Sequence, residues 1–216
     1  MLKRVIITGG TGGLGKSIVQ FFETAGWEVV ALGRKDLDLT DEVAVSMFFS
    51  EHDCDLLVCA AGIVRDQPLI KIEESTWDEM MAVNFASARN CALAAIPVMI
   101  EKGAGHVVFI SSYAAHHPSA GQSAYATAKA AILGFTRDLA RLHGSNRIRV
   151  NAILPGFMET PMTDNVSDKR RQEVRESHVL GKFNTPEATA QFILFLEEHM
   201  PHTSGQVFQL DSRVDL

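Results

Sequence analysis

Short apolar runs alternate with amphipathic segments along the whole chain. The apolar runs predict strands, and they fall at residues 4–8, 27–32, 55–60, 107–111, 147–154 and 206–210. The longer segments between them repeat their apolar residues at helical spacing. This alternation is typical of a parallel sheet covered by helices, so we expect an α/β fold. No repeat or linker interrupts the pattern, and residues 1–216 are expected to form a single domain.

Several predicted helices have recognisable ends. Thr76 and Glu79 have the spacing of a capping box, which would begin a long central helix. Pro97 should bend or divide that helix. Thr185 and Pro186 form an N-cap followed by a first-turn proline. The predicted helices cover residues 14–25, 41–52, 76–99, 125–143 and 185–198.

The connection between the second and third predicted strands is unusually short. Only about twenty residues separate Arg34 from Cys54. A helix-strand-helix connection needs more, because each crossover alone takes at least ~10–12 residues. We expect residues 37–39 to be a vestigial strand, followed by the helix at 41–52. One helix after the second strand is therefore predicted to be deleted, which would leave the sheet thin at this edge.

Composition and charge act mainly by excluding functions. The formal net charge of -6, without a sustained basic stripe, argues against nucleic acid as a partner. Cys54, Cys59 and Cys91 lack metal-ligand spacing and suit a reducing compartment. No apolar run approaches the ~20 residues of a membrane span. We expect a cytoplasmic protein without a metal site, a nucleic-acid partner or a membrane partner.

A glycine-rich turn follows the first predicted strand and opens the first helix. It reads Thr8-Gly9-Gly10-Thr11-Gly12-Gly13-Leu14-Gly15. Free backbone N–H groups and the positive end of the helix dipole would meet there, in a geometry that binds pyrophosphate. Such a turn can serve packing alone, but the strand before it and the helix after it favour a dinucleotide.

The end of the second predicted strand bears on which dinucleotide is bound. An acidic side chain there would accept a hydrogen bond from the ribose 2′-hydroxyl of NAD. This chain instead reads Gly33-Arg34-Lys35, which leaves room for a phosphate and supplies cations to pair with it. NADP(H) is therefore favoured over NAD(H). Asp36 and Asp38 are the counter-evidence, since a loop that turned Asp36 inward would favour NAD.

A phenol, an ammonium and a hydroxyl are the candidate catalytic groups. Tyr125 and Lys129 are four residues apart on a predicted helix, so they share a face. A neighbouring ammonium should lower the phenol pKa from ~10 towards the range in which acid–base catalysis is effective. Ser112, at a strand end, can donate a hydrogen bond to a substrate carbonyl. Each residue alone could be structural, but the small residues around Tyr125 and Lys129 favour the catalytic interpretation.

Taken together, these motifs resemble the short-chain dehydrogenase/reductase family, most closely its 3-oxoacyl-[acyl-carrier-protein] reductase group, over essentially the whole length. The resemblance implies a Rossmann-type, doubly wound parallel sheet. It also implies an NADP(H)-dependent oxidoreductase that reduces a ketone or 3-oxoacyl group to an alcohol, or catalyses the reverse. The matching residues are Thr8-Gly9-x-x-x-Gly13-x-Gly15, Val83-Asn84-Phe85, Ser111-Ser112, Tyr125-x-x-x-Lys129 and Leu154-Pro155-Gly156-Phe157-Met158-Glu159-Thr160.

The resemblance further implies roles for single residues. Tyr125 would be the general acid/base, and Ser112 would orient the carbonyl. Lys129 would bind the nicotinamide ribose and tune Tyr125, while Asn84 would hold a water in a proton relay. The residues expected to contact the cofactor are Thr8, Gly9, Thr11, Gly12, Gly13, Leu14, Gly15, Gly33, Arg34, Asp38, Leu39, Ala60, Ala61, Gly62, Tyr125, Lys129, Pro155, Gly156 and Thr160.

Two segments depart from the family pattern. The usual Asn-Asn-Ala-Gly is Cys59-Ala60-Ala61-Gly62 here, so the side-chain hydrogen bonds of the asparagines are lost. We interpret Cys59 as a small core residue. Near the C-terminus, Asp211-Ser212-Arg213 stands where the family often has Asp-Gly-Gly.

The substrate is only loosely constrained by the sequence. Residues 161–184 are expected to form a mobile lid, with His116, His117, Pro118 and Gln122 at the rim of the pocket. A small-molecule carbonyl or alcohol and an acyl thioester both remain open. If acyl carrier protein delivers the substrate, the basic run 169–171 could guide docking. A homo-oligomer, either a tetramer or a dimer, is implied by the family.

Two other interpretations stay open. A sugar-nucleotide epimerase or reductase of the same family shares the cofactor turn and the Tyr-Lys pair, but the roughly 60 residues after Pro155 leave little room for its substrate domain. The second interpretation is a protein that binds a dinucleotide but catalyses no reaction. The set of Asn84, Ser112, Tyr125 and Lys129 argues against it.

Overall fold

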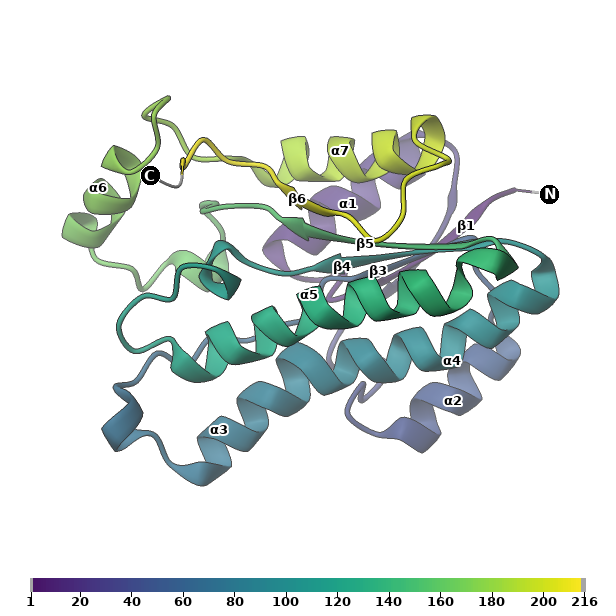
Figure 1. The fold of residues 1–216 in the computed structure, drawn as a ribbon, viewed down its shortest axis with the longest axis horizontal. Helices are drawn as coiled ribbons and strands as arrows, with labels where there is room; N and C mark the ends of the chain where they lie inside the picture. Colours follow the sequence, from purple (N-terminus) through teal and green to yellow (C-terminus); the bar gives the residue numbers. More distant parts are fainter. Residues whose placement is uncertain (1, 215–216) are drawn as a thin grey trace.

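A computed structural model describes residues 2–214, which form a six-stranded, all-parallel sheet with helices on both faces (Figure 1). The strand order is β2-β1-β3-β4-β5-β6. The order reverses between β1 and β3, which is where doubly wound sheets place their ligand crevice. The predicted α/β fold is confirmed. The strands are β1 (Arg4–Thr8), β2 (Glu28–Leu32), β3 (Leu56–Cys59), β4 (Gly105–Ile110), β5 (Ile148–Leu154) and β6 (Val207–Gln209).

Helices cover the two faces in separate groups. One face carries α1 and α7, and the other carries α2, α4 and α5 (Figure 1). Neighbouring residues of β1 alternate between the two cores, since Val5 and Ile7 belong to the α1/α7 side and Ile6 to the other. The helices are α1 (Gly13–Thr24), α2 (Glu42–Glu51), α3 (Glu74–Met81), α4 (Ser87–Lys102), α5 (Ser123–His143), α6 (Asp168–Glu176) and α7 (Pro186–His199).

One helix is missing after β2, at the edge of the sheet, as predicted. Only α2 lies between β2 and β3, and β2 is the edge strand. The vestigial strand expected at 37–39 is wrong, because this segment forms no strand and the backbone turns at Leu39 and Thr40. The Asp38 carboxylate accepts hydrogen bonds from the backbone N–H of Thr40 at 2.9 Å and its hydroxyl at 2.7 Å. Asp41 then caps α2 by accepting from the N–H groups of Val43 and Ala44.

The long central helix differs from its prediction at two points. It begins at Glu74 with Glu73 as N-cap, so the capping box expected at Thr76 and Glu79 is wrong. Pro97 lies inside α4 and does not divide it. The interruption is a π-helical turn, η2 (Ala82–Ala86), between α3 and α4. Leu93 and Pro97 both lie on the exposed face, where water can bond the carbonyl that a proline leaves free.

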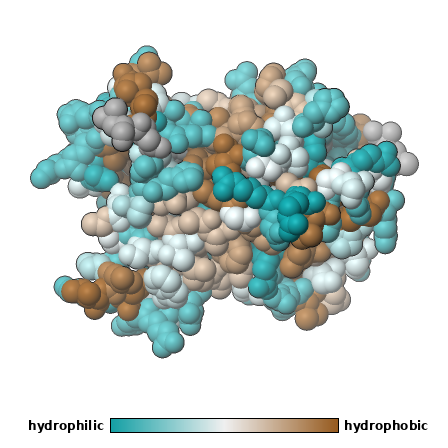
Figure 2. Space-filling model, in the orientation of Figure 1, coloured by the Kyte–Doolittle hydropathy of each residue, from teal (hydrophilic) through white to brown (hydrophobic). Residues whose placement is uncertain are grey.

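The composite helix over Glu74–Lys102 is long and apolar enough to resemble a membrane span. Half of its most apolar window is buried, and it packs on β3, β4, α2 and α5. This is the position of a core helix. On the face shown in Figure 2, polar groups separate the apolar patches.

Candidate active site

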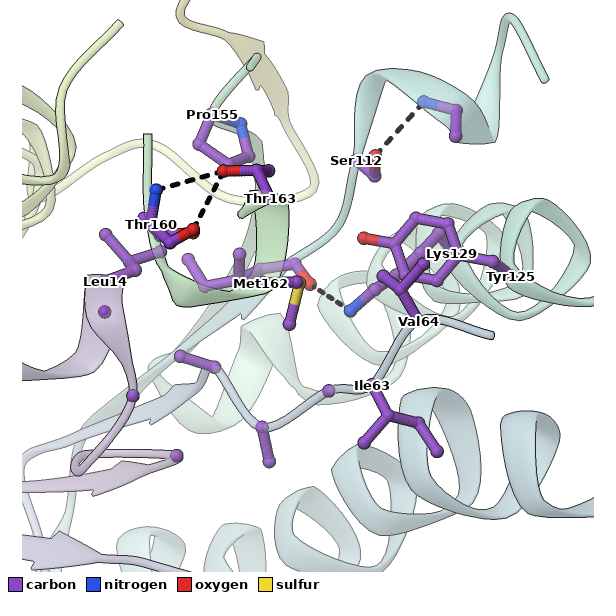
Figure 3. A pocket seen from close by; sticks show the side chains of 18 of the residues that line it. Leu14, Ile63, Val64, Ser112, Tyr125, Lys129, Pro155, Thr160, Met162 and Thr163 are labelled. Carbon is purple, nitrogen blue, oxygen red and sulfur yellow. Dashed lines mark hydrogen bonds between the residues drawn. The ribbon is translucent and has the colours of Figure 1, made fainter. Parts of the chain in front are cut away.

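A cavity of about 1050 Å³ opens at the carboxyl ends of the strands. It is bordered by the glycine-rich turn, the ends of β2, β3, β4 and β5, the start of α5 and residues 162–174 of the segment expected to form a lid. Figure 3 shows Ser112, Tyr125 and Lys129 on one side of this space and Leu14 and Thr160 on the other. Residues from the two ends of the chain therefore meet in one crevice.

The glycine-rich turn is shaped by contacts that leave no space for side chains. Gly9 has a φ of +69°, and a methyl group there would lie 2.8 Å from the carbonyl oxygen of Ala60. At Gly13 it would lie 2.8 Å from the Cβ of Thr160. The N–H of Gly12 donates to the Gly9 oxygen at 2.9 Å and closes the turn. A smooth, backbone-lined cradle at the start of α1 fits a pyrophosphate group.

All but one of the residues expected to contact the cofactor line this cavity. The exception is Thr8, which is 2% exposed and whose hydroxyl accepts from the Ala61 N–H at 3.4 Å. Thr8 therefore holds the loop at Ala61 from the buried side and does not face the cavity. The lining positions are Gly9, Thr11, Gly12, Gly13, Leu14, Gly15, Gly33, Arg34, Asp38, Leu39, Ala60, Ala61, Gly62, Tyr125, Lys129, Pro155, Gly156 and Thr160.

The loop after β2 separates its charges. Arg34 lines the cavity. The Asp36 carboxylate folds back and accepts from the Gly33 N–H at 2.7 Å, and Asp36 is not among the lining residues. Asp38 does line the cavity, but its hydrogen bonds from Thr40 hold it in the turn and lower its pKa. The inward swing of Asp36 that would favour NAD does not occur in this structure.

Tyr125 projects from the first turn of α5 into the cavity and is half-buried. Burial raises the pKa of its phenol, a hydrogen bond with Ser112 opposes that rise, and the charge of Asp66 adds to it. The expectation that Lys129 would lower the phenol pKa is therefore wrong for the chain without cofactor. The physical reason is that desolvation outweighs the favourable contacts.

Lys129 is buried and directed at the end of β4. Its Nζ donates to the carbonyl oxygen of Ile110 at 2.9 Å and lies 5.8 Å from the centre of the Tyr125 ring. Burial lowers the pKa of Lys129 to about 8. Ser111 reinforces the junction, since its hydroxyl donates to the Lys129 carbonyl at 2.8 Å.

Asn84 lies one layer behind the cavity, in the π-helical turn. Its Oδ1 accepts from the N–H of Ile63 at 3.0 Å, and its Nδ2 donates to the carbonyls of Ile63 and Met80, both at 3.0 Å. A methyl group on Gly62 would lie 2.9 Å from Oδ1 of Asn84 and 3.6 Å from Nζ of Lys129. Gly62 therefore lets the strand-end loop pass between Asn84 and Lys129.

The remaining predictions have mixed outcomes. His117 and Gln122 line the cavity as expected at the rim, whereas His116 and Pro118 do not. Cys59 is a buried residue of β3 in the core, as interpreted from the sequence. Arg213 also lines the cavity and was missed. Its only sequence signal was the departure from Asp-Gly-Gly. The apolar lining that the sequence analysis did not identify includes Ile63, Val64, Val83, Ala114 and Ala120. Met162, Val166 and Val174 also line the cavity and belong to the segment 161–184 that was expected to cover the substrate.

The chain is similar in sequence to known reductases over nearly its whole length. The family described as Enoyl-(Acyl carrier protein) reductase matches residues 36–212. The 3-oxoacyl-[acyl-carrier-protein] reductase FabG of Thermotoga maritima is 33% identical over 97% of this chain and 96% of the relative. Carbonyl reductase family member 4 of Xenopus laevis is 29% identical over 100% and 99%.

A solved structure agrees with these relatives. A candidate NAD(P)-dependent gluconate 5-dehydrogenase from Beutenbergia cavernae, with NADP bound at low occupancy, superposes with a TM-score of 0.93. It is 27% identical and covers 97% of this chain and 95% of its own. The chain belongs to the short-chain dehydrogenase/reductase family. It is an NAD(P)-dependent oxidoreductase that acts on CH–OH or C=O groups.

Proposed function

We propose that this protein is an NADP(H)-dependent oxidoreductase that reduces a ketone or 3-oxoacyl group to an alcohol, or catalyses the reverse, with Tyr125 as general acid/base. The observation that carries this proposal is the convergence of Ser112, Tyr125 and Lys129 in the crevice that begins at the glycine-rich turn. FabG relatives at 33% and 34% identity support a 3-oxoacyl or related carbonyl substrate.

A dinucleotide would occupy two regions of the cavity, one for each of its ends. The turn at Gly9–Gly15 and the loop at Gly33–Leu39 would hold its pyrophosphate and adenosine end, while Pro155, Gly156 and Thr160 would border the nicotinamide. A bound nicotinamide supplies the hydride acceptor or donor. The protein contributes binding, orientation and proton transfer.

The catalytic residues have complementary proposed tasks. Tyr125 keeps its proton at neutral pH because burial raises its pKa, so it can donate that proton to a carbonyl oxygen as the oxygen gains negative charge. Ser112 would donate a hydrogen bond to the same oxygen. Lys129 would bind the nicotinamide ribose and place positive charge near the phenol. Asn84, through a water, would connect this site to solvent.

The preference for NADP(H) rests on the loop after β2. Arg34 faces the cavity, and a guanidinium can pair with a 2′-phosphate through two hydrogen bonds. Asp36, which would repel that phosphate, bonds to the Gly33 N–H instead. Recognition of NAD would instead need a carboxylate that is free to accept hydrogen bonds from the ribose hydroxyls.

We further propose a soluble, cytoplasmic homo-oligomer. Exposed Leu93 on α4 and Leu142 on α5 support packing between copies through these helices. Acyl carrier protein remains a candidate partner. Of the basic run, Arg171 braces the lid through the carbonyls of Thr163 and Val166, so Lys169 and Arg170 would contribute most to docking.

The proposal is tested by following NADPH and NADH oxidation with a panel of simple ketones, 3-oxo esters and 3-oxoacyl thioesters. Turnover of at least one carbonyl class, faster with NADPH at limiting cofactor, is expected. Tight NADPH binding without turnover of any of them would favour a dinucleotide-binding protein that is not a catalyst.

A further inference from the structure

The chain returns to the active-site crevice after β6 and places an ion pair there. Arg213 lines the cavity, and the Asp211 side chain is fully buried. Nε of Arg213 donates to Oδ2 of Asp211 at 2.6 Å, and Nη2 donates to the same oxygen. Two donors on one carboxylate fix the plane of the guanidinium.

That plane lies on the ring of Tyr113. The guanidinium carbon is 3.4 Å from the ring centre, which is close stacking contact. Tyr113 directly follows Ser112, the residue that would hold the substrate carbonyl. Arg213 is thus packed on the residue that follows Ser112, by contacts that leave its position little freedom.

Several parts of the crevice hold the C-terminal segment in place. Ser212 binds the lid, since its carbonyl accepts from the N–H of Val179 at 3.0 Å and its hydroxyl accepts from the N–H of Leu180 at 3.3 Å. Asp211 packs on the loop that would border the nicotinamide, because a methyl group on Gly156 would lie 2.6 Å from its Cβ. Arg213 is therefore supported from three directions.

Within the part of the chain that the structure describes, one nitrogen of this guanidinium has no hydrogen-bond partner. Within residues 2–214, Nε and Nη2 of Arg213 bind Asp211, and Nη1 donates no hydrogen bond. Arg34 lines the cavity in the loop after β2, and Arg170 lines it from α6. Arg170 differs from Arg213, because its Nη1 pairs with Glu173 at 3.1 Å and its Nη2 donates to Ser119 at 2.9 Å. Arg213 is consequently an arginine with spare donor capacity in the same cavity as Ser112.

The acidic residues of the cavity have other contacts. Oδ2 of Asp66 accepts from Gln122 at 3.1 Å, and Glu79 lies 3.9 Å from Arg65. Much of the remaining substrate-side lining is apolar, including Val64, Met162 and Val166. In such surroundings a charge-assisted hydrogen bond from Nη1 to an anionic oxygen is strong and selective.

We propose that Arg213 determines substrate specificity by binding a carboxylate of the substrate, so that the protein acts on free oxo acids in preference to their neutral esters and thioesters. This rests on the proposed carbonyl reduction and deepens it by naming the substrate class. Asp211 positions the guanidinium but does not touch the substrate. No proton or electron moves through Arg213.

The test compares acetoacetate with methyl acetoacetate and with acetoacetyl-N-acetylcysteamine in NADPH oxidation. Wild-type kcat/KM should favour acetoacetate by about tenfold or more. In Arg213→Gln this preference should vanish while kcat/KM for the ester is retained. Arg175→Gln is the matched control, since it removes a lid arginine that stacks on Phe183 outside the cavity, and it should keep the wild-type preference.

Arg213→Gln removes the guanidinium from the buried Asp211 carboxylate, whose Oδ1 still accepts from Gln209 and from the backbone N–H of residue 213. The double variant Asp211→Asn/Arg213→Gln is therefore measured beside it. Removing both charges of the pair keeps the segment neutral and should abolish the preference equally. Absence of a preference in the wild type, or an equal loss for acid and ester in both variants, would overturn the assignment.

Binding gives the same answer without turnover. Calorimetric titration of the NADPH-loaded protein should detect butyrate but not butyramide in the wild type, and neither in Arg213→Gln. Arg213-dependent butyrate binding without turnover of any carbonyl compound would refute the proposed reduction but support the carboxylate site. Turnover of the ester without Arg213-dependent butyrate binding would refute the site alone.

Discussion

Nζ of Lys129 lies 5.8 Å from the centre of the Tyr125 ring, and its hydrogen bond goes to the carbonyl oxygen of Ile110 at 2.9 Å. The ammonium is thus tied to the end of β4 and reaches the phenol through space. Without cofactor, both groups are governed by burial, which raises the pKa of Tyr125 and lowers that of Lys129 to about 8.

The buried lysine should make stability depend on pH. Because the pKa of Lys129 falls from 10.5 to about 8 on folding, this lysine by itself contributes a rise of stability with pH across that window. The buried thiols of Cys54, Cys59 and Cys91, whose pKa values burial raises, contribute a fall over the same range. The lysine contribution is therefore the difference in slope between the wild type and a variant that lacks Lys129. The full shift corresponds to about 3 kcal/mol. Urea unfolding of the cofactor-free protein from about pH 7.5 to about pH 10.5 gives the free energy of unfolding across this window.

Lys129→Met should lose the lysine contribution, so its stability should change less favourably with rising pH than that of the wild type, and it should be at least as stable as wild type at the lower end of the pH window. Lys182→Met, which changes an exposed lysine, should retain the wild-type slope. An unchanged slope in Lys129→Met would show that the ammonium does not carry the desolvation cost.

Gly62→Ala should damage both stability and catalysis. The added methyl group would lie 2.9 Å from Oδ1 of Asn84 and close to Lys129, so the loop must shift at a cost of about 1–3 kcal/mol. Thermal unfolding and kcat measure the two effects. Gly144→Ala is the control, since nothing lies within 4 Å of its added carbon. A normal kcat in Gly62→Ala would separate this loop from the catalytic groups.

Arg34→Ala should weaken NADPH binding by about tenfold or more, equivalent to about 1.4 kcal/mol, because the 2′-phosphate loses its paired cation. NADH binding should change little. Fluorescence titration of both cofactors checks this. Lys35→Ala removes the adjacent cation, which does not line the cavity, and should have the smaller effect. Equal weakening of both cofactors in Arg34→Ala would place Arg34 away from the phosphate.

Docking of acyl carrier protein should depend on salt. If Lys169 and Arg170 guide an acidic carrier, kcat/KM for carrier-bound substrate should fall as ionic strength rises, because exposed charges are screened. The rate with a free thioester should not follow the same trend. A salt-insensitive rate with the carrier-bound substrate would exclude these residues as a docking site.

The parts of the site that follow from local sequence were predicted well. The glycine-rich turn depends on a strand, a helix and backbone space that are all adjacent in the chain, and its lining residues were identified from Gly9 to Gly15. Tyr125 and Lys129 were placed together for the same reason, since helical spacing alone puts them on one face.

Errors arose where distant contacts overrode local patterns. The alternation Leu37-Asp38-Leu39 does direct both leucines towards the core. Thr40 donates two hydrogen bonds to Asp38, however, and the backbone turns there and forms no strand. Trp77 and Met80 pack with Ile63 and Tyr125, and this cluster helps to fix the helix that begins before the apparent capping box.

The C-terminal ion pair could not be predicted from spacing. Arg213 stacks on Tyr113, a residue far away in the sequence, and no local pattern encodes that contact. The direction of the Tyr125 pKa was also beyond the sequence, because the depth of burial outweighs a charge whose presence was correctly expected. Both outcomes depend on the assembled crevice.

The proton donated by Tyr125 is the central claim, and Tyr125→Phe tests it most directly. The variant keeps the ring that packs with Ile63 and Met80 and loses only the hydroxyl. The rate of NADPH oxidation with saturating carbonyl substrate should fall by about 10²–10⁴-fold, with NADPH affinity and unfolding temperature close to wild type. A Tyr125→Phe rate equal to that of the wild type would contradict the account.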